Sequence, residues 1–415
     1  MLLLTELFPP AVGGSPVLFE AIYSRLRNTA VVVLADNKVA VRPVAVRRDA
    51  TGLTVVRRPL ATAQWGIRAP QAFVNHVRVA LEARKLGSRG EVIVHCGRAL
   101  PEGVAAWLSR RFGGPAYLCW AHGEDIATAL QSREFSWLMT RVYRNAAATI
   151  ANSLSTGRML EAIGMPPDRI HVIHPGVDVQ RFRPHLDADL RARFAGDGRI
   201  LLLSVGRLQR RKGHDLAIEA VSRLGASVPV SYLIVGDGAE RAHLEGLVAR
   251  HRLQDRVHFL GEVPARDLPR YYAACDIFLL PNRIDEGDVE GFGIVFLEAA
   301  ATGRPTIGGR SGGVPEAVLD GETGRLVSGT DADELADVIQ DLASSPEKRH
   351  AMGTAGRDRV CRSFTWERAA ARVSEVHSEI ASRDRVSPGD LYPRKRYHLT
   401  RLLTAILRPR QRSRR

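Results

Sequence analysis

Short runs of β-forming apolar residues alternate with helical patterns along almost the whole chain, and this alternation restricts the possible folds more than any other feature. Strands that alternate with helices form βαβ units around a parallel sheet. A first series of expected strands is followed by a charged segment at 178–197 and then by a second series, which predicts two consecutive doubly wound α/β domains. The expected strands are 1–4, 30–35, 53–56, 91–96, 116–121, 148–152 and 170–176, then 199–206, 231–238, 257–261, 276–281, 305–309 and 324–327; helices are expected near 70–86, 100–112, 133–145 and 153–163.

The length agrees with this organisation. A chain of 415 residues with 45% hydrophobic content is too long for one ordinary core and suits two domains of about 200 residues each. We expect the first domain at 1–180 and the second at 181–363. Ligands of doubly wound sheets bind at the carboxyl ends of strands, where Gly-rich turns meet helix N-termini. Two such domains facing each other would form a binding cleft.

Cysteines and apolar runs indicate the cellular setting. The four cysteines lie far apart without CxxC spacing, so neither a zinc site nor a disulfide framework is expected, and a reducing cytosolic setting fits best. The first ten residues lack the basic segment of a signal peptide and read as a strand and turn. No run approaches the ~18 apolar residues that span a bilayer. We expect a soluble or peripheral protein.

The net charge of +14 is concentrated at the C-terminus. Residues 383–415 contain eleven Lys or Arg and two Asp, a local charge of +9, and the apolar residues between them follow i, i+3, i+4, i+7, i+8 spacing: Leu399, Leu402, Leu403, Ile406 and Leu407. A basic amphipathic helix is typical of a segment that lies on an anionic membrane. The alternative is a helix packed on its own domain with a solvated end. Nucleic acid is not expected as a partner, because no aromatic interleaving or known module accompanies the arginines.

A basic turn in LLLSVGRLQRRKG favours a phosphate ligand. Arg207 follows an expected strand, and Lys212 precedes Gly213, where a helix is expected to begin. Two cations beside the backbone N–H groups of a helix N-terminus suit a diphosphate. The alternative is a solvated basic turn.

Two features of the first domain also point to a ligand. Gly13 and Gly14 precede an expected helix and could bring backbone donors close to it, although Gly-Gly pairs often only form turns. His122 follows a strand and precedes Gly123, so it is placed to bond a substrate, unless it only bonds neighbouring backbone.

The stretch EGFGIVFLEAAATGRP places Glu290 and Glu298 eight positions apart. On one helix they would lie about 80° apart and two turns from each other, so they do not form a same-face pair. If Gly291 and Gly293 interrupt the chain, Glu290 lies on the entering loop and Glu298 inside an apolar helix. A buried carboxylate requires hydrogen bonds, and the two hydroxyls of a ribose would supply them. A surface position for Glu298 is the alternative.

Metal and classical nucleotide motifs are weak. Two Asp-x-Asp strings, at 187–189 and 331–333, both open expected helices, where acidic residues cap the N-terminus. No metal site is therefore expected. There is no GxxxxGK[ST] loop, and GDGAER at 236–241 lacks the third glycine of a dinucleotide fingerprint. Kinase and dehydrogenase functions lose support accordingly.

Together these motifs resemble the family 4 glycosyltransferases, retaining enzymes of the GT-B fold, over nearly the whole chain. The resemblance rests on FPPAVGG, AHGED, HPGVD, SVGRLQRRKG, IVGDG, VHFLG, EGFGIVFLEAAATGRP and GGVPEAV. DVEGFGIVFLEA especially resembles the corresponding motif of mannosyltransferases that act on phosphatidylinositol and related lipids. Transferases that build capsular and lipopolysaccharide glycans contain similar motifs. The sequence departs from the former around residues 11–22, where a more polar segment is typical.

The resemblance implies roles for individual residues. Glu298 would hold the ribose hydroxyls, Glu290 the hydroxyls of the donor sugar, and His122 the sugar near its reacting carbon. Arg207 and Lys212 would bind the diphosphate, and the C-terminal helix, 364–382, would cross back onto the first domain. Backbone groups of Phe292, Gly293 and Ile294 would face the sugar and phosphates. Gly14 would lie near the phosphate and acceptor side, and Gly206 is a further expected donor-binding position.

The expected function is metal-independent transfer of a hexosyl group of mannose or glucose type, with retention, from a nucleotide diphosphate sugar to a lipid-linked or glycan hydroxyl. No cofactor is expected beyond the donor. The expected location is cytoplasmic, with possible attachment to the inner face of the membrane. Two alternatives stay open: a nucleotide-sugar epimerase on the same scaffold, and a nucleotide-sugar-binding protein without turnover.

Overall fold

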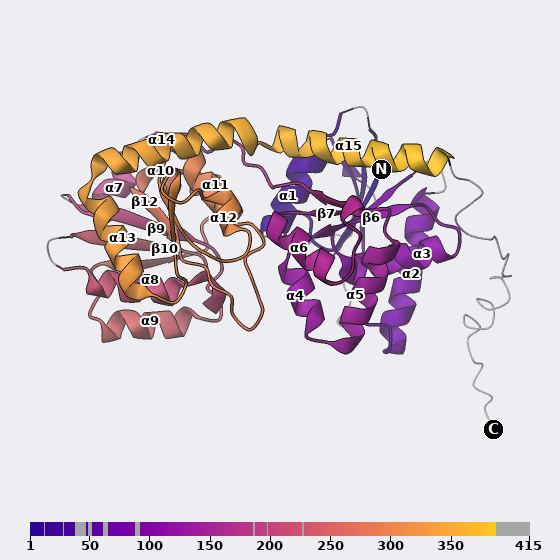
Figure 1. Ribbon diagram of the computed structural model, residues 1–415, viewed down its shortest axis with the longest axis horizontal. Helices are drawn as coiled ribbons and strands as arrows, with labels where there is room; N and C mark the ends of the chain where they lie inside the picture. The colour runs from indigo at the N-terminus through magenta and orange to yellow at the C-terminus, as the bar shows by residue number, and fades with distance from the viewer. Residues whose placement is uncertain are drawn as a thin grey trace, which may run out of the picture.

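Two sheets flanked by helices lie side by side in the computed structural model, and a long C-terminal helix pair runs along both (Figure 1). The structure describes residues 1–11, 13–27, 29–37, 47–48, 52–60, 65–87, 92–185, 187–196, 198–225 and 228–386. The expected amphipathic segment at 399–407 lies outside these residues. Within them, no helix is both long enough and apolar enough to cross a bilayer.

The first sheet has the strand order β3-β4-β2-β1-β5-β6-β7-β8, and its strands run parallel except for β3, which pairs antiparallel with β4. The alternation of the sequence predicted every strand of this sheet except β3, which is only two arginines long. Its strands are β1 (Leu2–Thr5), β2 (Val32–Asp36), β3 (Arg47–Arg48), β4 (Thr54–Arg58), β5 (Val94–Cys96), β6 (Tyr117–Ala121), β7 (Ala148–Ala151) and β8 (Ile170–Val172).

The second sheet is parallel throughout, with the order β11-β10-β9-β12-β13-β14. The order reverses between β9 and β12, which is where doubly wound sheets bind ligands. All six strands coincide with expected ones: β9 (Ile200–Val205), β10 (Val230–Val235), β11 (Val257–Gly261), β12 (Ile277–Leu280), β13 (Thr306–Gly309) and β14 (Gly324–Val327). The predicted fold of two doubly wound α/β units is confirmed.

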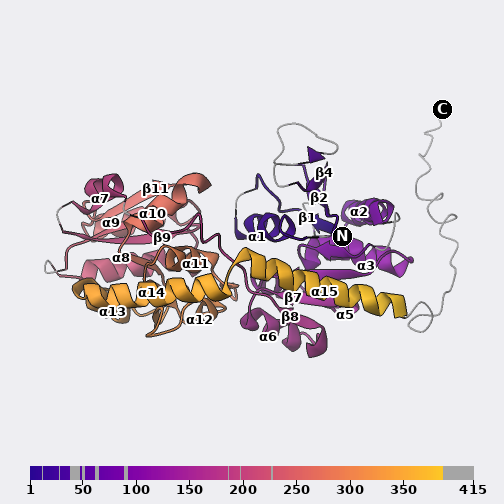
Figure 2. The same cartoon turned by 90° about the horizontal axis from the view of Figure 1, so that it is seen from above.

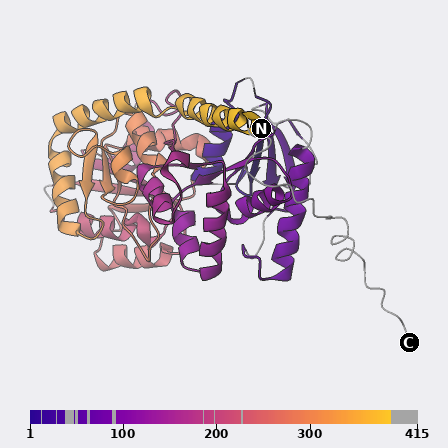
Figure 3. The same ribbon diagram turned by 45° about the vertical axis from the view of Figure 1, so that its right-hand side comes forward.

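Helices cover both faces of each sheet (Figures 1 and 3). Strand β1 shows why the apolar runs are continuous: Leu2 and Leu4 pack into one core and Leu3 into the core on the opposite face. The helices of the first half are α1 (Gly14–Tyr23), α2 (Pro70–Gly87), α3 (Val104–Arg111), α4 (Glu124–Leu130), α5 (Arg133–Asn145) and α6 (Leu154–Ala162), with short helical turns at Ala99–Gly103 and Pro167–Arg169.

The second half follows the same pattern around its own cores. Its helices are α7 (Ala188–Ala195), α8 (His214–Arg223), α9 (Arg241–Arg250), α10 (Leu268–Ala274), α11 (Ile294–Ala301), α12 (Val314–Ala317), α13 (Ala332–Ser344), α14 (Pro346–Ser363) and α15 (Trp366–Val386), with short turns at Arg210–Lys212 and Ala265–Asp267.

Helix α15 returns to the first sheet, where it lies beside α1 (Figure 2). It extends four residues beyond the expected end at 382. Its apolar side joins the core of the first domain through Trp366, Ala369, Ala370, Val373, Val376 and Ile380.

The chain crosses between the domains twice, at one place. The backbone N–H of Val177 donates to the carbonyl of Phe364 (2.9 Å). A Cβ on Gly176 would lie 2.4 Å from the backbone nitrogen of Trp366. Only glycine allows the two crossing segments to approach this closely.

A buried chain of hydrogen bonds also attaches α15 to the first sheet. Trp120 Nε1 donates to the hydroxyl of Tyr23 (3.1 Å), which lies 2.8 Å from Nδ1 of His95. His95 Nε2 lies 3.0 Å from Nδ1 of His377 on α15. Indole can only donate, so the Tyr23 hydroxyl is free to donate to His95 Nδ1. The His95 ring then carries its proton on Nε2 and donates to His377.

Acidification should weaken this attachment. Burial lowers the pKa of His377 to about 4. Burial also lowers the pKa of His95 well below its usual value, and charge repulsion from His377 lowers it further. The unfolded chain binds these protons near pH 6.5, so it holds more protons than the folded chain below that pH. The contribution of His377 to stability is therefore complete above pH 6.5 and is lost as the pH falls towards 4.

We expect the contribution of His377 to the free energy of unfolding to fall by about 1–2 kcal/mol between pH 7 and pH 5. Urea unfolding of the wild type and of His377→Phe at both pH values isolates the effect. The exposed His350 provides the control, since His350→Phe should leave the pH dependence unchanged. Equal pH dependence in the wild type and His377→Phe would contradict the assignment.

Candidate active site

The basic turn lies at the end of β9, the central strand of the second sheet. Gly206 and Arg207 follow the strand, and Lys212 ends a short helical turn before Gly213, which has φ 74° and precedes α8. Lys212 is buried, and a Cβ on Gly206 would lie 3.9 Å from its Cε atom. Burial lowers the pKa of Lys212, against the attraction of Glu290. Arg207 keeps 62% of its side chain exposed.

Glu290 lies against these cations. Its Oε2 atom accepts hydrogen bonds from Lys212 Nζ, from Arg211 (2.9 Å) and from Asn282 Nδ2 (3.0 Å). Burial alone would raise the pKa of Glu290, but Lys212 and Arg211 outweigh it and lower that pKa to about 2. The carboxylate is therefore ionised at neutral pH.

Arg211 organises the cluster and was not predicted. Its buried guanidinium contacts three carboxylates: Glu290 (2.9 Å), Asp288 (2.9 Å) and Glu124 (3.0 Å). Glu124 lies in the first turn of α4 in the first domain, and Arg207 also reaches it (3.4 Å). Burial alone would lower the pKa of Arg211, but the attraction of Glu290, Asp288 and Glu124 raises it. The cluster thus links the two domains through charge.

Loss of Arg211 should destabilise the protein measurably. Removing one member of a buried ionic cluster leaves uncompensated charge, so Arg211→Met should lower the free energy of unfolding by on the order of 2 kcal/mol. Urea unfolding gives the value. Arg210→Met is the matched control, because Arg210 is an exposed neighbour that pairs with Asp285 at 3.4 Å, and its replacement should change stability little. Equal stabilities of the two variants would show that the cluster has no stabilising role.

Glu298 lies where the glycines of its motif predicted. Gly293, with φ 90°, precedes α11, so Glu290 lies on the entering loop and Glu298 in the second turn of a mostly buried helix. The side chain is half-buried, and its Oε2 accepts a hydrogen bond from the hydroxyl of Tyr272 (2.6 Å). Burial raises the pKa of Glu298 to about 7, against the hydrogen bond from Tyr272. This carboxylate has room for a further donor.

His122 and the Glu290 loop meet at the domain contact. His122 Nε2 lies 3.0 Å from the carbonyl of Gly97. A carbonyl only accepts, so Nε2 carries the proton and Nδ1 of the neutral ring is an acceptor. A Cβ on Gly291 would lie 2.0 Å from the His122 carbonyl oxygen and 2.7 Å from Asn152 Nδ2. Glycine is required here because the two domains touch through backbone.

The remaining predicted residues lie at the same contact. A Cβ on Gly14, the first residue of α1, would lie 3.8 Å from Cδ1 of Ile294, the first residue of α11. Phe292 turns its ring inward, 5.3 Å from the ring of His174 and 5.8 Å from that of Phe364. Its side chain is therefore structural, which leaves its backbone as the only part able to contact a ligand.

Glu316 forms a second contact between the domains, which the sequence did not reveal. From α12 it accepts the backbone N–H groups of Leu154 (2.7 Å) and Ser155 (3.0 Å) at the start of α6. It also contacts His174 Nε2 (2.7 Å) in the connecting segment. Burial alone would raise the pKa of Glu316, but these hydrogen bonds, that of His174 first, hold it below its usual value. A carboxylate of one domain thus caps a helix of the other.

The Asp-x-Asp strings act as helix caps. Asp187 accepts the backbone N–H of Leu190 and pairs with Arg270, while Asp331 accepts the backbone N–H groups of Asp333 and Glu334. In the described part of the chain, no group of three or more His, Cys, Asp or Glu residues is arranged to hold a metal ion.

Comparison with known proteins identifies the family of the chain. Residues 187–359 match the family model described as "Glycosyl transferases group 1", and residues 12–181 match "Glycosyltransferase Family 4". The chain is 33% identical, over 91% of its length and 98% of the relative, to the GDP-mannose-dependent alpha-(1-6)-phosphatidylinositol monomannoside mannosyltransferase of Mycolicibacterium smegmatis. It is 30% identical, over 90% of its length and 97% of the relative, to the corresponding monoacylated-substrate enzyme of Corynebacterium glutamicum.

Solved structures show the same fold at lower identity. The sucrose-phosphate synthase of Thermosynechococcus elongatus aligns with a TM-score of 0.77 and 24% identity, over 92% of this chain and 99% of that one. A glycosyltransferase of Rickettsia africae aligns with a TM-score of 0.74 and 20% identity, over 91% of this chain and 98% of that one.

Proposed function

The chain belongs to glycosyltransferase family 4 and has the GT-B fold, and from this we propose that it transfers a hexosyl group from a nucleotide diphosphate sugar to a hydroxyl of a lipid-linked or glycan acceptor. The structural observation that carries the proposal is the ionised Glu290 between Lys212 and Arg211 at the domain contact. Among the described residues, the hydrogen bonds that this carboxylate accepts from Lys212, Arg211 and Asn282 all end on Oε2. Oε1 remains to accept a sugar hydroxyl.

We propose mannose as the sugar and GDP-mannose as the donor. Four relatives that match about nine-tenths of this chain are GDP-mannose-dependent mannosyltransferases that act on phosphatidylinositol monomannoside. The acceptor favoured by this likeness is a mannosylated inositol phospholipid.

The cations would favour departure of the diphosphate. Negative charge grows on the leaving phosphate as its bond to the anomeric carbon breaks, so Arg207 and Lys212 would stabilise the transition state more than the ground state. In the structure Arg207 and Arg211 contact Glu124. The diphosphate would replace Glu124 as the partner of Arg207.

The other residues would hold the donor in place. The ribose would donate its two hydroxyls to Glu298, while a sugar hydroxyl would donate to Nδ1 of His122. Backbone groups of Gly206, Gly293 and Ile294 would border the phosphates and sugar, and Gly14 would lie on the phosphate and acceptor side. The proposed reaction retains the anomeric configuration and uses no metal. The acceptor hydroxyl attacks from the face the diphosphate leaves, and its proton passes to the leaving phosphate oxygen.

A donor screen tests this proposal. Purified protein is incubated with GDP-, UDP- and ADP-sugars, with and without a lipid extract that contains inositol phospholipids, and the products are separated. We expect lipid-dependent consumption of GDP-mannose and a mannosylated lipid. A free altered sugar formed without acceptor would instead identify an epimerase, and binding without turnover would identify a nucleotide-sugar-binding protein.

Cytoplasmic location and peripheral attachment to the inner face of the membrane are also proposals. The basic residues at 383–415 support them through their charge. No nucleic acid partner is proposed. Deletion of residues 387–415, which leaves α15 intact, followed by cell fractionation tests the role of the tail.

A further inference from the structure

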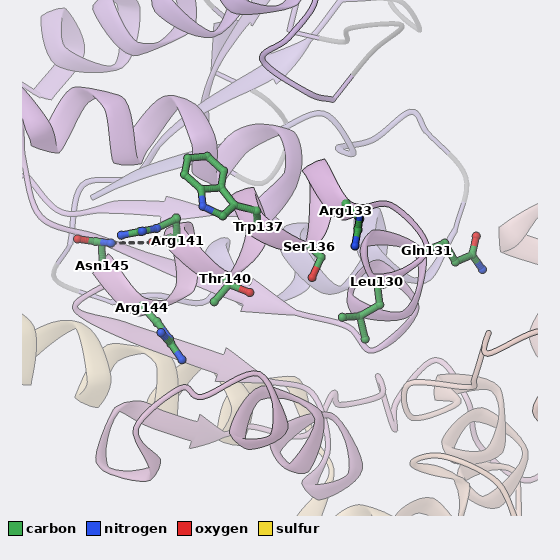
Figure 4. Close-up of a pocket in the computed structure, with 9 residues that line it drawn as sticks. All are labelled: Leu130, Gln131, Arg133, Ser136, Trp137, Thr140, Arg141, Arg144 and Asn145. Atoms are coloured by element: carbon green, nitrogen blue, oxygen red, sulfur yellow. Dashed lines mark hydrogen bonds between the residues drawn. The ribbon is translucent and has the colours of Figure 1, made fainter.

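The outer face of α5 carries a hollow that the proposed reaction does not use. It has a volume of about 660 Å³, and Figure 4 shows its lining side chains along α5 and the end of α4. At 100° per residue, the lining positions on α5 between Arg133 and Arg144 fall within about 140° of one another. The lining residues are Leu130, Gln131, Arg133, Ser136, Trp137, Thr140, Arg141, Arg144 and Asn145.

The opposite side of α5 explains why this face is turned outward. Leu138, Met139, Val142 and Tyr143 are buried in the first domain. Trp137, together with Leu130 at the end of α4, is directed away from that core, and each keeps 48% of its surface exposed. Large apolar side chains that gather on a surface mark a place of contact with another phase or molecule.

The charge of this face has one sign. In the part of the chain that the structure describes, none of Arg133, Arg141 and Arg144 forms an ion pair with a carboxylate. Arg141 lies over the ring of Trp137 (5.5 Å), and Arg144 donates to the carbonyl of Gly164 (3.2 Å). These contacts orient the guanidinium groups without neutralising them.

The acidic residue of α5 does not offset this charge. Glu134 lies at the edge of this face, where its Oε1 accepts the backbone N–H groups of Ile67 (2.8 Å) and Arg68 (2.9 Å) and its side chain stays only 18% exposed. The outer face therefore presents three cations around an exposed indole.

From this arrangement we infer that the outer face of α5 docks on the phosphate groups of an anionic lipid bilayer. Tryptophan prefers the boundary between water and lipid, and arginine pairs with phosphate. An open face with exposed arginines fits a bilayer surface better than a soluble anion, which is normally enclosed by converging donors. The inference rests on the proposed function only in that a lipid-linked acceptor lies in a bilayer.

The position of this face agrees with that role. Gln131, at one end of the hollow, donates through Nε2 to the carbonyl of Glu286 in the second domain (3.3 Å). Glu286 lies two residues before Asp288 of the Arg211 cluster. A bilayer that contacts α5 therefore lies next to the domain contact where the acceptor must enter.

Vesicle binding without donor or acceptor tests the inference separately from glycosyl transfer. Full-length protein is sedimented with phosphatidylcholine vesicles that contain phosphatidylglycerol, and with vesicles of phosphatidylcholine alone. We expect Arg133→Glu/Arg141→Glu to weaken binding to the anionic vesicles by roughly 30-fold or more, since each cation near such a surface contributes about fivefold. Brominated lipids should quench the fluorescence of the wild type more than that of Trp137→Phe.

Arg250→Glu/Arg266→Glu is the matched control, because it makes the same change in net charge on exposed parts of the second domain. Both double variants retain the basic C-terminal residues, and their thermal unfolding midpoints should equal that of the wild type. Equal loss of binding in the two double variants would overturn the inference, because net charge alone would then explain it. Wild-type vesicle binding by the α5 double variant would also overturn it, as would loss of affinity only for soluble pyrophosphate.

Discussion

Lys212→Ala should lower kcat by about 10³-fold, because removal of one preorganised group that stabilises developing charge costs about 10²–10³ in rate and Lys212 is buried against the proposed diphosphate site. The fold should survive, since Glu290 keeps its hydrogen bonds to Arg211 and Asn282. Steady-state kinetics with GDP-mannose and the lipid acceptor, together with thermal unfolding, measure both outcomes.

The matched control is Arg210→Ala. Arg210 belongs to the same helical turn but faces Asp285 with 67% of its side chain exposed. Because surface substitutions of this kind usually have small effects, the kcat of Arg210→Ala should stay within about twofold of the wild type. A folded Lys212→Ala variant with wild-type kcat would refute the role assigned to Lys212.

Glu298→Gln should raise the KM for the donor by about 100-fold at pH 8, because the half-buried carboxylate proposed to accept two ribose hydroxyls loses its charge. The wild type should show a pH dependence that this variant lacks. Burial raises the pKa of Glu298 to about 7, and a ribose diol prefers the ionised form. Donor affinity is thus complete above pH 7 and falls, by up to about tenfold per pH unit, as the pH drops through that value.

Two tyrosines of α10 supply a paired test. The hydroxyl of Tyr272 donates to Glu298 and holds down its pKa, so Tyr272→Phe should move the midpoint of the KM profile to higher pH. Tyr271→Phe should leave the profile in place. A KM for the donor that does not change between pH 6 and pH 8 in the wild type would rule out Glu298 as the ribose ligand.

The fold could be predicted because parallel strands are buried on both faces. That burial makes each strand a continuous apolar run, as in β1 and β9. Strand β3 escaped prediction since two arginines carry no apolar pattern. The placement of Glu290 on a loop and Glu298 on a helix was also predictable, because Gly293 interrupts the chain between them.

The charged contacts between domains could not be predicted from local pattern. One short helical turn contains Arg210, Arg211 and Lys212, and with about three residues per turn their side chains point in different directions. Only the tertiary structure shows that Arg211 is the residue that contacts the carboxylates of both domains. Glu124 and Glu316 resemble ordinary acids near helix starts. Their partners lie 83 to 87 and 142 to 162 positions away in the chain.

The return of α15 to the first sheet determines the order in which the two domains can finish folding during synthesis. The core under α1 contains side chains from Leu3 to Ile380, so its first and last members in chain order are separated by 377 positions. While the ribosome synthesises the second domain, the apolar surface of the first domain that α15 later covers stays exposed. The first domain is therefore completed after the second, and a chain that terminates before α15 would expose that surface to chaperones and proteases.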